Sequence, residues 1–194
     1  DPGPRFREVL AELDSTAPEF AVSVGDAVYS ETSDDAAMRR KWDAYRTAIF
    51  GLKTPVVQTL GNHDAFDAPS LALWKGMYGD TYFHWDAGCA RFIALDCESE
   101  PARFGNPGSV PARLDAEQFA WLEALLTDSA GKKVFLFVHR PLFPVVGHVG
   151  DSLDECPEDR DRLHALLVRF RDRVAGVFHG HEHVFCHQDI DGVD

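Results

Sequence analysis

Four groups of polar residues, each at the end of an apolar run, have the side chains that a metal-dependent hydrolytic site requires. They are Asp26, the tetrapeptide Gly61-Asn62-His63-Asp64, His139, and the pair His181 and His183. Carboxylate, amide and imidazole groups are ligands of divalent cations. One carboxylate such as Asp26 can also bridge two cations about 3.5 to 4 Å apart, the usual spacing in two-metal hydrolytic sites. The groups therefore predict a metal site capable of hydrolysis.

The tetrapeptide follows the apolar run 55–60 and offers three functional side chains in consecutive positions. Asn62 suits a neutral ligand for a hard cation. His63 and Asp64 are typical of a proton donor and the carboxylate that orients it. The alternative is an ordinary turn before a helix that begins near Asp67.

Structural alternatives also exist for the other groups. Asp26 is a common residue in a turn after glycine, and the alternative for His139 is a half-buried histidine with satisfied hydrogen bonds. His181 and His183 lie on the same side of an extended chain, whereas a loop after Gly180 lets them diverge to neighbouring cations. Alternating histidines on a strand can also bind a single zinc ion. The presence of all four groups favours a shared metal site over separate structural roles.

Predicted helices and strands must position these groups. Because they alternate along the chain, the sequence predicts an α/β fold. Helical spacing of apolar residues predicts helices around 6–13, 38–49, 71–77, 119–126 and 163–170. Apolar runs predict strands at 20–24, 56–60, 81–85, 90–95, 133–138 and 174–178, with a last strand-like run from Val184.

The polar groups follow four of the predicted strands. Ligand sites of layered α/β folds gather at the carboxyl ends of strands, so we expect the four groups to converge there. Two long loops, 98–114 and 143–155, are expected to border the cleft because they are rich in proline or glycine.

The composition limits the class of protein. The 194 residues are 45% hydrophobic, which suits one domain with a substantial core. The net charge of -13 argues against a general nucleic-acid or anionic-membrane binder. The four cysteines lack CxxC spacing, which indicates neither a zinc ribbon nor a redox pair and leaves a disulfide open. No apolar run has membrane-spanning length, so we expect a protein that is either cytoplasmic or exported with an upstream signal removed.

The ordered set of motifs resembles that of the calcineurin-like metallophosphoesterases. The matching pieces are Gly25-Asp26, Gly61-Asn62-His63-Asp64, His139 after an apolar strand, and Gly180-His181-Glu182-His183. They span most of the chain. The resemblance implies a four-layer α/β/β/α sandwich of two mixed β-sheets flanked by helices, within one catalytic domain at 1–194.

The resemblance also assigns the metal ligands. It makes Asp26 the bridge between two metal ions and gives Asn62, His139 and His181 to the second metal. His183 belongs to the first metal. The ions implied are two divalent or mixed-valence metals, with manganese, iron and zinc all compatible with oxygen and imidazole ligands.

The first metal of the family normally takes an Asp and a His from a DxH motif that nothing before Asp26 supplies. We therefore expect the natural protein to extend beyond both ends, with a first strand and C-terminal strands that 1–194 lacks. The chain itself is expected to carry a complete ligand set for one metal and half a set for the other.

The implied reaction is hydrolysis of a phosphate ester, a phosphodiester or phosphomonoester, by a metal-activated hydroxide. His63 would protonate the leaving group, and Asp64 would hold the His63 ring. Arg140 is a candidate contact to the substrate phosphate, with a surface ion pair as its alternative. The chain has no room for a large cap domain, which favours an open cleft for a diester or bulky ester.

Two other classes of function stay open at the level of sequence. One is a non-catalytic module that keeps the fold and binds a metal or another protein. The other is a mononuclear zinc hydrolase that uses the histidine cluster, although it leaves Asn62 and Asp26 without roles.

Overall fold

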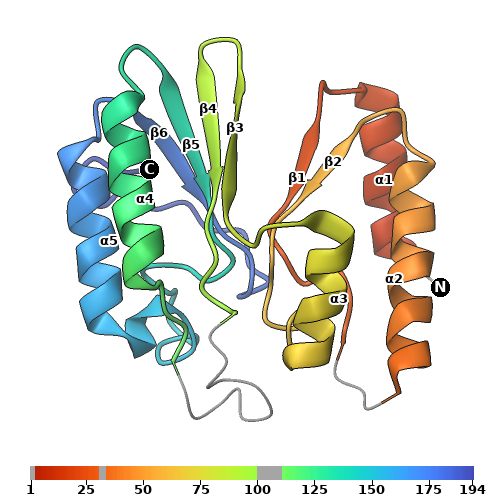
Figure 1. Ribbon diagram of the computed structural model, residues 1–194. Helices are drawn as coiled ribbons and strands as arrows, with labels where there is room; N and C mark the ends of the chain where they lie inside the picture. Colours follow the sequence, from red (N-terminus) through yellow and green to blue (C-terminus); the bar gives the residue numbers. More distant parts are fainter. Residues whose placement is uncertain (1–2, 31–33, 100–110) are drawn as a thin grey trace.

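The computed structural model describes residues 3–30, 34–99 and 111–194. Two β-sheets lie in the middle of the molecule and helices cover their outer sides (Figure 1). The layers follow the order helices, four-stranded sheet, two-stranded sheet, helices. The predicted α/β sandwich of two sheets flanked by helices is confirmed. In the described residues the four-stranded sheet is mixed and the two-stranded sheet is parallel.

The smaller sheet pairs β1 with β2 in parallel, with Val22 opposite Val57. Three helices accompany this sheet, and α1 and α2 lie on its outer side (Figure 1). The bounds of these elements are α1 (Pro4–Thr16), β1 (Ala21–Ser23), α2 (Asp35–Phe50), β2 (Val56–Gln58) and α3 (Ala68–Tyr78).

Local sequence signals set the ends of these helices. The Asp34 side chain accepts hydrogen bonds from the first backbone N–H groups of α2, which would otherwise lack partners. Asp67 and Ser70 form a reciprocal capping box at the start of α3. The apolar stripe of α2 shares a core with Trp74 of α3 and comprises Met38, Trp42, Tyr45 and Ile49.

The larger sheet has the order β3-β4-β5-β6. Strands β3 and β4 form an antiparallel hairpin whose turn is at Gly88 and Cys89, and β4, β5 and β6 are parallel. The bounds are β3 (Phe83–Ala87), β4 (Ala90–Ala94), α4 (Ala116–Asp128), β5 (Lys133–Phe137), α5 (Pro157–Arg169) and β6 (Val174–Phe178).

The two faces of the larger sheet pack against different parts of the molecule. Ile93, Val134 and Leu136 point to the outer face, where they share one core with residues of α4 and α5. Aromatic side chains occupy the other face, and Phe92 meets Phe20, which precedes β1, edge to face with ring centroids 5.0 Å apart. This contact joins the two sheets, so the loops at their carboxyl ends are held beside each other.

The strand predicted from Val184 is wrong. Residues 184–189 form no strand, and Phe185 is fully exposed. The neighbouring edge of β6 instead receives the end of the described chain, because the Val177 N–H donates to the Asp194 carbonyl at 2.7 Å. Strand formation needs a partner backbone, and an apolar run does not supply one.

All four cysteines are free thiols, with Cys97 and Cys156 buried. Among the described residues, no helix combines the length and the apolar character needed to cross a bilayer.

Candidate metal centre

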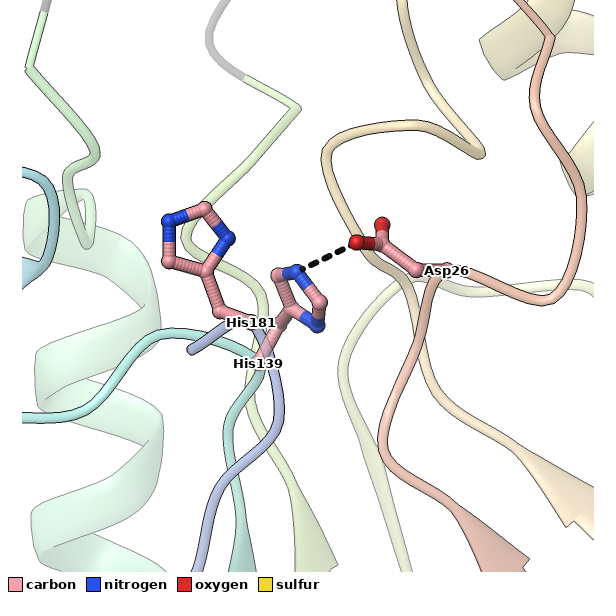
Figure 2. A group of neighbouring side chains, drawn as sticks. All are labelled: Asp26, His139 and His181. Atoms are coloured by element: carbon pink, nitrogen blue, oxygen red, sulfur yellow. Dashed lines mark ion pairs between the residues drawn. The ribbon is translucent and has the colours of Figure 1, made fainter. Parts of the chain in front are cut away.

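The predicted groups meet where the carboxyl ends of the two sheets come together. Asp26 follows β1, Asn62 follows β2, His139 follows β5 and His181 follows β6. In Figure 2, Asp26 reaches from the side of the smaller sheet towards His139 and His181, which come from the larger sheet. Neither sheet alone could form this site.

Four of the five predicted metal ligands point their donor atoms at one another. The nearest ligand atoms of Asp26, His139 and His181 all lie within 4.8 Å of each other, and His139 Nε2 is 3.2 Å from Asp26 Oδ2. Asn62 Oδ1 lies 2.9 Å from His139 Nε2 and 3.0 Å from His181 Nδ1. Two oxygens and two imidazoles thus form one donor set.

The hydrogen bonding of His139 shows that this donor set fits a metal ion. Its Nδ1 lies 2.7 Å from the Val24 carbonyl oxygen, which can only accept, so Nδ1 carries the proton. Nε2 then faces the oxygens of Asn62 and Asp26, to which an imidazolium would donate and beside which a neutral ring offers its lone pair to a metal ion. A cation among these atoms satisfies all of them.

The charges of the cluster are coupled. Burial lowers the pKa of His139, but the hydrogen bond and charge of Asp26 outweigh it, so the net shift is upward. Burial raises the pKa of Asp26, yet His139 brings the net shift below the ordinary value. Burial and the charges of Arg140 and His139 lower the pKa of His181, which favours the neutral imidazole that binds metals.

Left-handed backbone aims several of these side chains. Asp26, His181 and His183 have φ values of 56, 67 and 53°. Residues other than glycine rarely adopt this left-handed conformation. Such strain of about 1–3 kcal/mol per residue is typical of functional sites. The turns, rather than strand geometry, therefore decide where the ligands point.

Glycines in the motifs let the loops approach closely. A Cβ on Gly61 would lie 2.3 Å from the Asp26 backbone nitrogen, and a Cβ on Gly25 would lie 2.6 Å from His139 Nδ1. Gly25 also has a φ of 99°. Gly180 is less crowded, since its Cβ would lie 3.0 Å from Val24 Cγ2. The glycines are therefore required by contacts between the ligand loops.

The sequence predicts Asp64 to hold the His63 ring, but the structure gives its carboxylate other partners. Asp64 is fully buried and accepts three hydrogen bonds, all from backbone N–H groups: those of Asp26, Val28 and Gly61. Burial raises the pKa of Asp64 to about 7, while the Val28 N–H opposes the shift. Asp64 therefore joins the Asp26 loop to the Gly61 loop.

His63 lies between the same two loops. Its backbone N–H donates to Asp26 Oδ1 at 2.9 Å, and its carbonyl accepts from the Ser30 N–H at 2.9 Å. Its ring stacks on Tyr29, with ring centroids 4.2 Å apart and an interplanar angle of 27°. The backbone bond to Asp26 places His63 beside the metal cluster, while its role as a proton donor stays a prediction.

His183 lies outside the cluster formed by the described residues. It is exposed, whereas His181 is partly buried with its Nδ1 facing Asn62. Both positions have left-handed backbone, so this segment is a turn and not a regular strand. The assignment of His183 to the first metal stays a prediction.

The sequence predicts that Arg140 contacts the substrate phosphate, with a surface ion pair as the alternative. In the structure Arg140 forms an ion pair that is buried. Its side chain is 4% exposed and that of Glu98 is 1% exposed, with Nε donating to Glu98 Oε1 at 2.6 Å. Arg140 Nη1 donates to the Asp151 carbonyl at 2.9 Å. Arg140 thus anchors the loop at Asp151 close to the site.

Two residues near the cluster carry no clear sequence signal. Asp151 Oδ1 lies 3.3 Å from His181 Nε2, the ring nitrogen that faces away from Asn62. Glu182 is buried and accepts from the Val145 N–H and the Ser152 hydroxyl, which ties the loop 143–155 to the His181 turn. The predicted position of this loop beside the site agrees with these contacts, whereas most of the loop 98–114 lies outside the described residues.

A cavity of about 380 Å³ has His179 among its lining residues. Leu142, Leu167, Val177 and Val193 give it largely apolar walls, and none of the four clustered ligands lines it. It is therefore not part of the metal site.

Comparisons with known proteins bear on the family and the fold. The family profile described as calcineurin-like phosphoesterase matches residues 2–185. Among solved structures, the chain is similar to a dimetal phosphatase from Danio rerio, with a TM-score of 0.70 and 17% sequence identity over 91% of this chain and 70% of that one. A search of curated proteins gave no significant match. At this identity the solved structure supports the fold, and the profile supports the family.

Proposed function

The chain belongs to the calcineurin-like phosphoesterase family, and on that premise we propose that it hydrolyses a phosphate ester at a dinuclear metal site. Asp26, Asn62, His139 and His181 hold the metal ions, and His63 supplies a proton. The substrate is a phosphodiester or a phosphomonoester.

The observation that carries the proposal is the convergence of donor atoms from four separate strand ends. Asn62 Oδ1 lies within 3.0 Å of ring nitrogens of both His139 and His181, and Asp26 lies 3.2 Å from His139. A structural ion pair between Asp26 and His139 would not require Asn62 and His181 to face the same point. A metal ion gives all four residues a common partner.

Bound divalent ions supply Lewis acidity to the phosphate oxygens and lower the pKa of water towards neutrality. The chain's own residues provide the ligand atoms and transfer the proton. Asp26 and Asn62 offer oxygens, while His139 presents Nε2 because its Nδ1 hydrogen bonds to Val24. His63, fixed to Asp26 through its backbone N–H, donates a proton to the departing oxygen.

The first metal of the proposed pair would take His183 as a ligand and would share Asp26 with the second metal. His183 is exposed and outside the four-residue cluster, so we propose that the first metal is the more weakly held of the two. Manganese, iron and zinc all accept such oxygen and imidazole ligands.

Metal content and turnover test the proposal together. We expect the protein loaded with manganese to cleave bis-p-nitrophenyl phosphate or p-nitrophenyl phosphate. Asn62→Ala and His181→Ala should each lower both bound metal and turnover. His84→Ala is the matched control, since His84 is an exposed histidine on β3 that takes no part in the cluster.

The alternatives give different results in the same assays. A binding module would hold metal and cleave neither ester. A mononuclear zinc hydrolase would turn over with one ion per chain and tolerate Asn62→Ala. Unchanged turnover in both Asn62→Ala and His181→Ala would refute the proposed site.

A further inference from the structure

One aromatic side chain beside the site is not explained by the core. Tyr29 is 55% exposed, yet its ring lies parallel to that of His63 with centroids 4.2 Å apart. Resting on the proposed function, we propose that Tyr29 is the positioning residue for His63, holding its imidazole where a proton reaches the leaving oxygen of the ester.

The backbone on both sides of Tyr29 is tied to the tetrapeptide loop. The Val28 N–H donates to Asp64 Oδ1 at 3.1 Å, and the Ser30 N–H donates to the His63 carbonyl at 2.9 Å. Hydrogen bonds therefore join residues 28–30 to residues 63–64. The stacking of the two rings continues a contact that the backbones already make.

Helix α2 fixes the same loop from the other side. Lys41 Nζ donates to the Tyr29 carbonyl at 2.6 Å. The next residue, Trp42, is 1% exposed in the core of the smaller sheet, so Lys41 stands on a well-packed helix. Tyr29 is thus held by its backbone, and its ring stacks on that of His63.

Stacking restricts the motion that matters for proton transfer. An imidazole on a loop can rotate about two side-chain bonds, and a proton donor must come within about 2.6–3.2 Å of its acceptor. A planar neighbour at stacking distance limits the ring to a narrow range of orientations. Because Tyr29 is more than half exposed, filling of the core does not account for this contact.

A spectroscopic experiment tests the contact without any turnover. In metal-free protein, the ring current of Tyr29 should shift the His63 ring-proton NMR signals upfield. Tyr29→Leu should move these signals towards random-coil values, and Tyr29→Phe should retain the shift because phenylalanine keeps the ring. Phe50→Leu is the matched control, since Phe50 is another exposed aromatic, at the end of α2. His63 signals that do not respond to Tyr29→Leu would overturn the inference while leaving the proposed function intact.

A kinetic experiment tests the purpose of the contact. If Tyr29 positions a proton donor, Tyr29→Leu should lower kcat for phenyl phosphate about 10- to 100-fold, a part of the 10²–10⁴-fold that acid–base groups contribute. It should affect p-nitrophenyl phosphate much less, because that leaving group departs without a proton. KM and bound metal should stay near the values of the parent protein, and Tyr29→Phe should restore most of the lost rate.

Three outcomes would count against the inference. Equal losses for the two esters would show a general disturbance of the site. Loss of bound metal in Tyr29→Phe would make the Tyr29 hydroxyl a ligand instead. Full activity of Tyr29→Leu on phenyl phosphate would show that the ring is dispensable. A parent protein that cleaves neither these two monoesters nor bis-p-nitrophenyl phosphate would refute the proposed function, and the NMR result would still decide whether Tyr29 holds the His63 ring.

Discussion

The carboxylate of Asp64 accepts a hydrogen bond from the backbone N–H of Asp26 at 2.8 Å, across 38 positions of the chain. Asp64 also accepts from Gly61 and Val28. A residue adjacent to the predicted proton donor thereby fixes the backbone of the predicted bridging ligand. The candidate metal site and the folded state of this half of the molecule therefore both depend on one buried carboxyl group.

Replacement of Asp64 is therefore expected to cost stability. In Asp64→Asn, the side-chain NH2 group must face a backbone N–H group at a position where a carboxylate oxygen now accepts a hydrogen bond. Leaving buried donors unpaired predicts a loss of about 2–4 kcal/mol in the free energy of unfolding, measured in urea. Asp43→Asn, on the exposed side of α2, should change it by less than about 0.5 kcal/mol. A loss in Asp64→Asn no larger than that of the control would contradict the joining role.

Sequence patterns predicted the elements but not the aim of the site residues. Apolar spacing identifies the α2 stripe of Met38, Trp42, Tyr45 and Ile49, because burial imposes that spacing on the sequence. It also predicts that Asp26, Asn62, His139 and His181 follow strands. Spacing carries no information on the left-handed φ at Asp26, His181 and His183, or on the position of His183 outside the cluster.

The sequence also failed to predict contacts between residues that lie far apart in the chain. The partner of Asp64 was expected to be its neighbour His63, whereas two of its three partners, Asp26 and Val28, lie more than 30 positions away. Residues far apart in the chain leave no periodic signal. The same reason hid the contact of Glu98 with Arg140, which is separated from it by 42 positions.

The Glu98–Arg140 pair predicts a large difference between buried and exposed ion pairs. Glu98→Gln leaves the Arg140 charge buried with a weaker partner, and removal of one partner from a buried pair costs about 3–5 kcal/mol. The matched control is Glu123→Gln, because Glu123 meets Arg169 at the same 2.6 Å with both side chains at least half exposed. That change should cost less than about 1 kcal/mol. If the two variants lost the same free energy of unfolding in urea, burial would not make the Glu98–Arg140 pair more important for stability than the exposed pair.

His179 predicts a loss of stability in acid. Burial lowers its pKa from 6.5 to about 4, and its Nδ1 lies 3.2 Å from the Val138 carbonyl. Between these two pH values the unfolded chain binds a proton that the folded chain does not, so stability falls as pH decreases. The shift corresponds to about 3 kcal/mol at most.

The measurement compares metal-free protein with His179→Gln, which does not titrate. The free energy of unfolding should decrease less between pH 6.5 and pH 4 in the variant than in the parent, where the limits are the two pKa values of His179. Other groups titrate equally in both proteins, so the difference isolates His179. Parallel pH profiles would show that the folded protein accepts the proton on His179 at no cost.

Gly61 gives the sharpest test of how the ligand loops fit together. A Cβ at this position would lie 2.3 Å from both the backbone nitrogen and Oδ1 of Asp26, so Gly61→Ala must displace the predicted bridging ligand. Manganese affinity, measured by calorimetry, should fall at least about 10- to 100-fold, as when the support of a metal ligand is removed.

Gly76→Ala is the matched control for this change. Gly76 is exposed within α3, and an alanine methyl group there would have no neighbouring atom within 4 Å. Alanine should therefore leave metal binding unchanged and raise helix stability by about 0.5–1 kcal/mol. If Gly61→Ala lowered stability but bound manganese as the parent does, Asp26 would not be a ligand in the position observed. A loss of affinity in Gly61→Ala alone would tie metal binding to the 2.3 Å approach between these two loops.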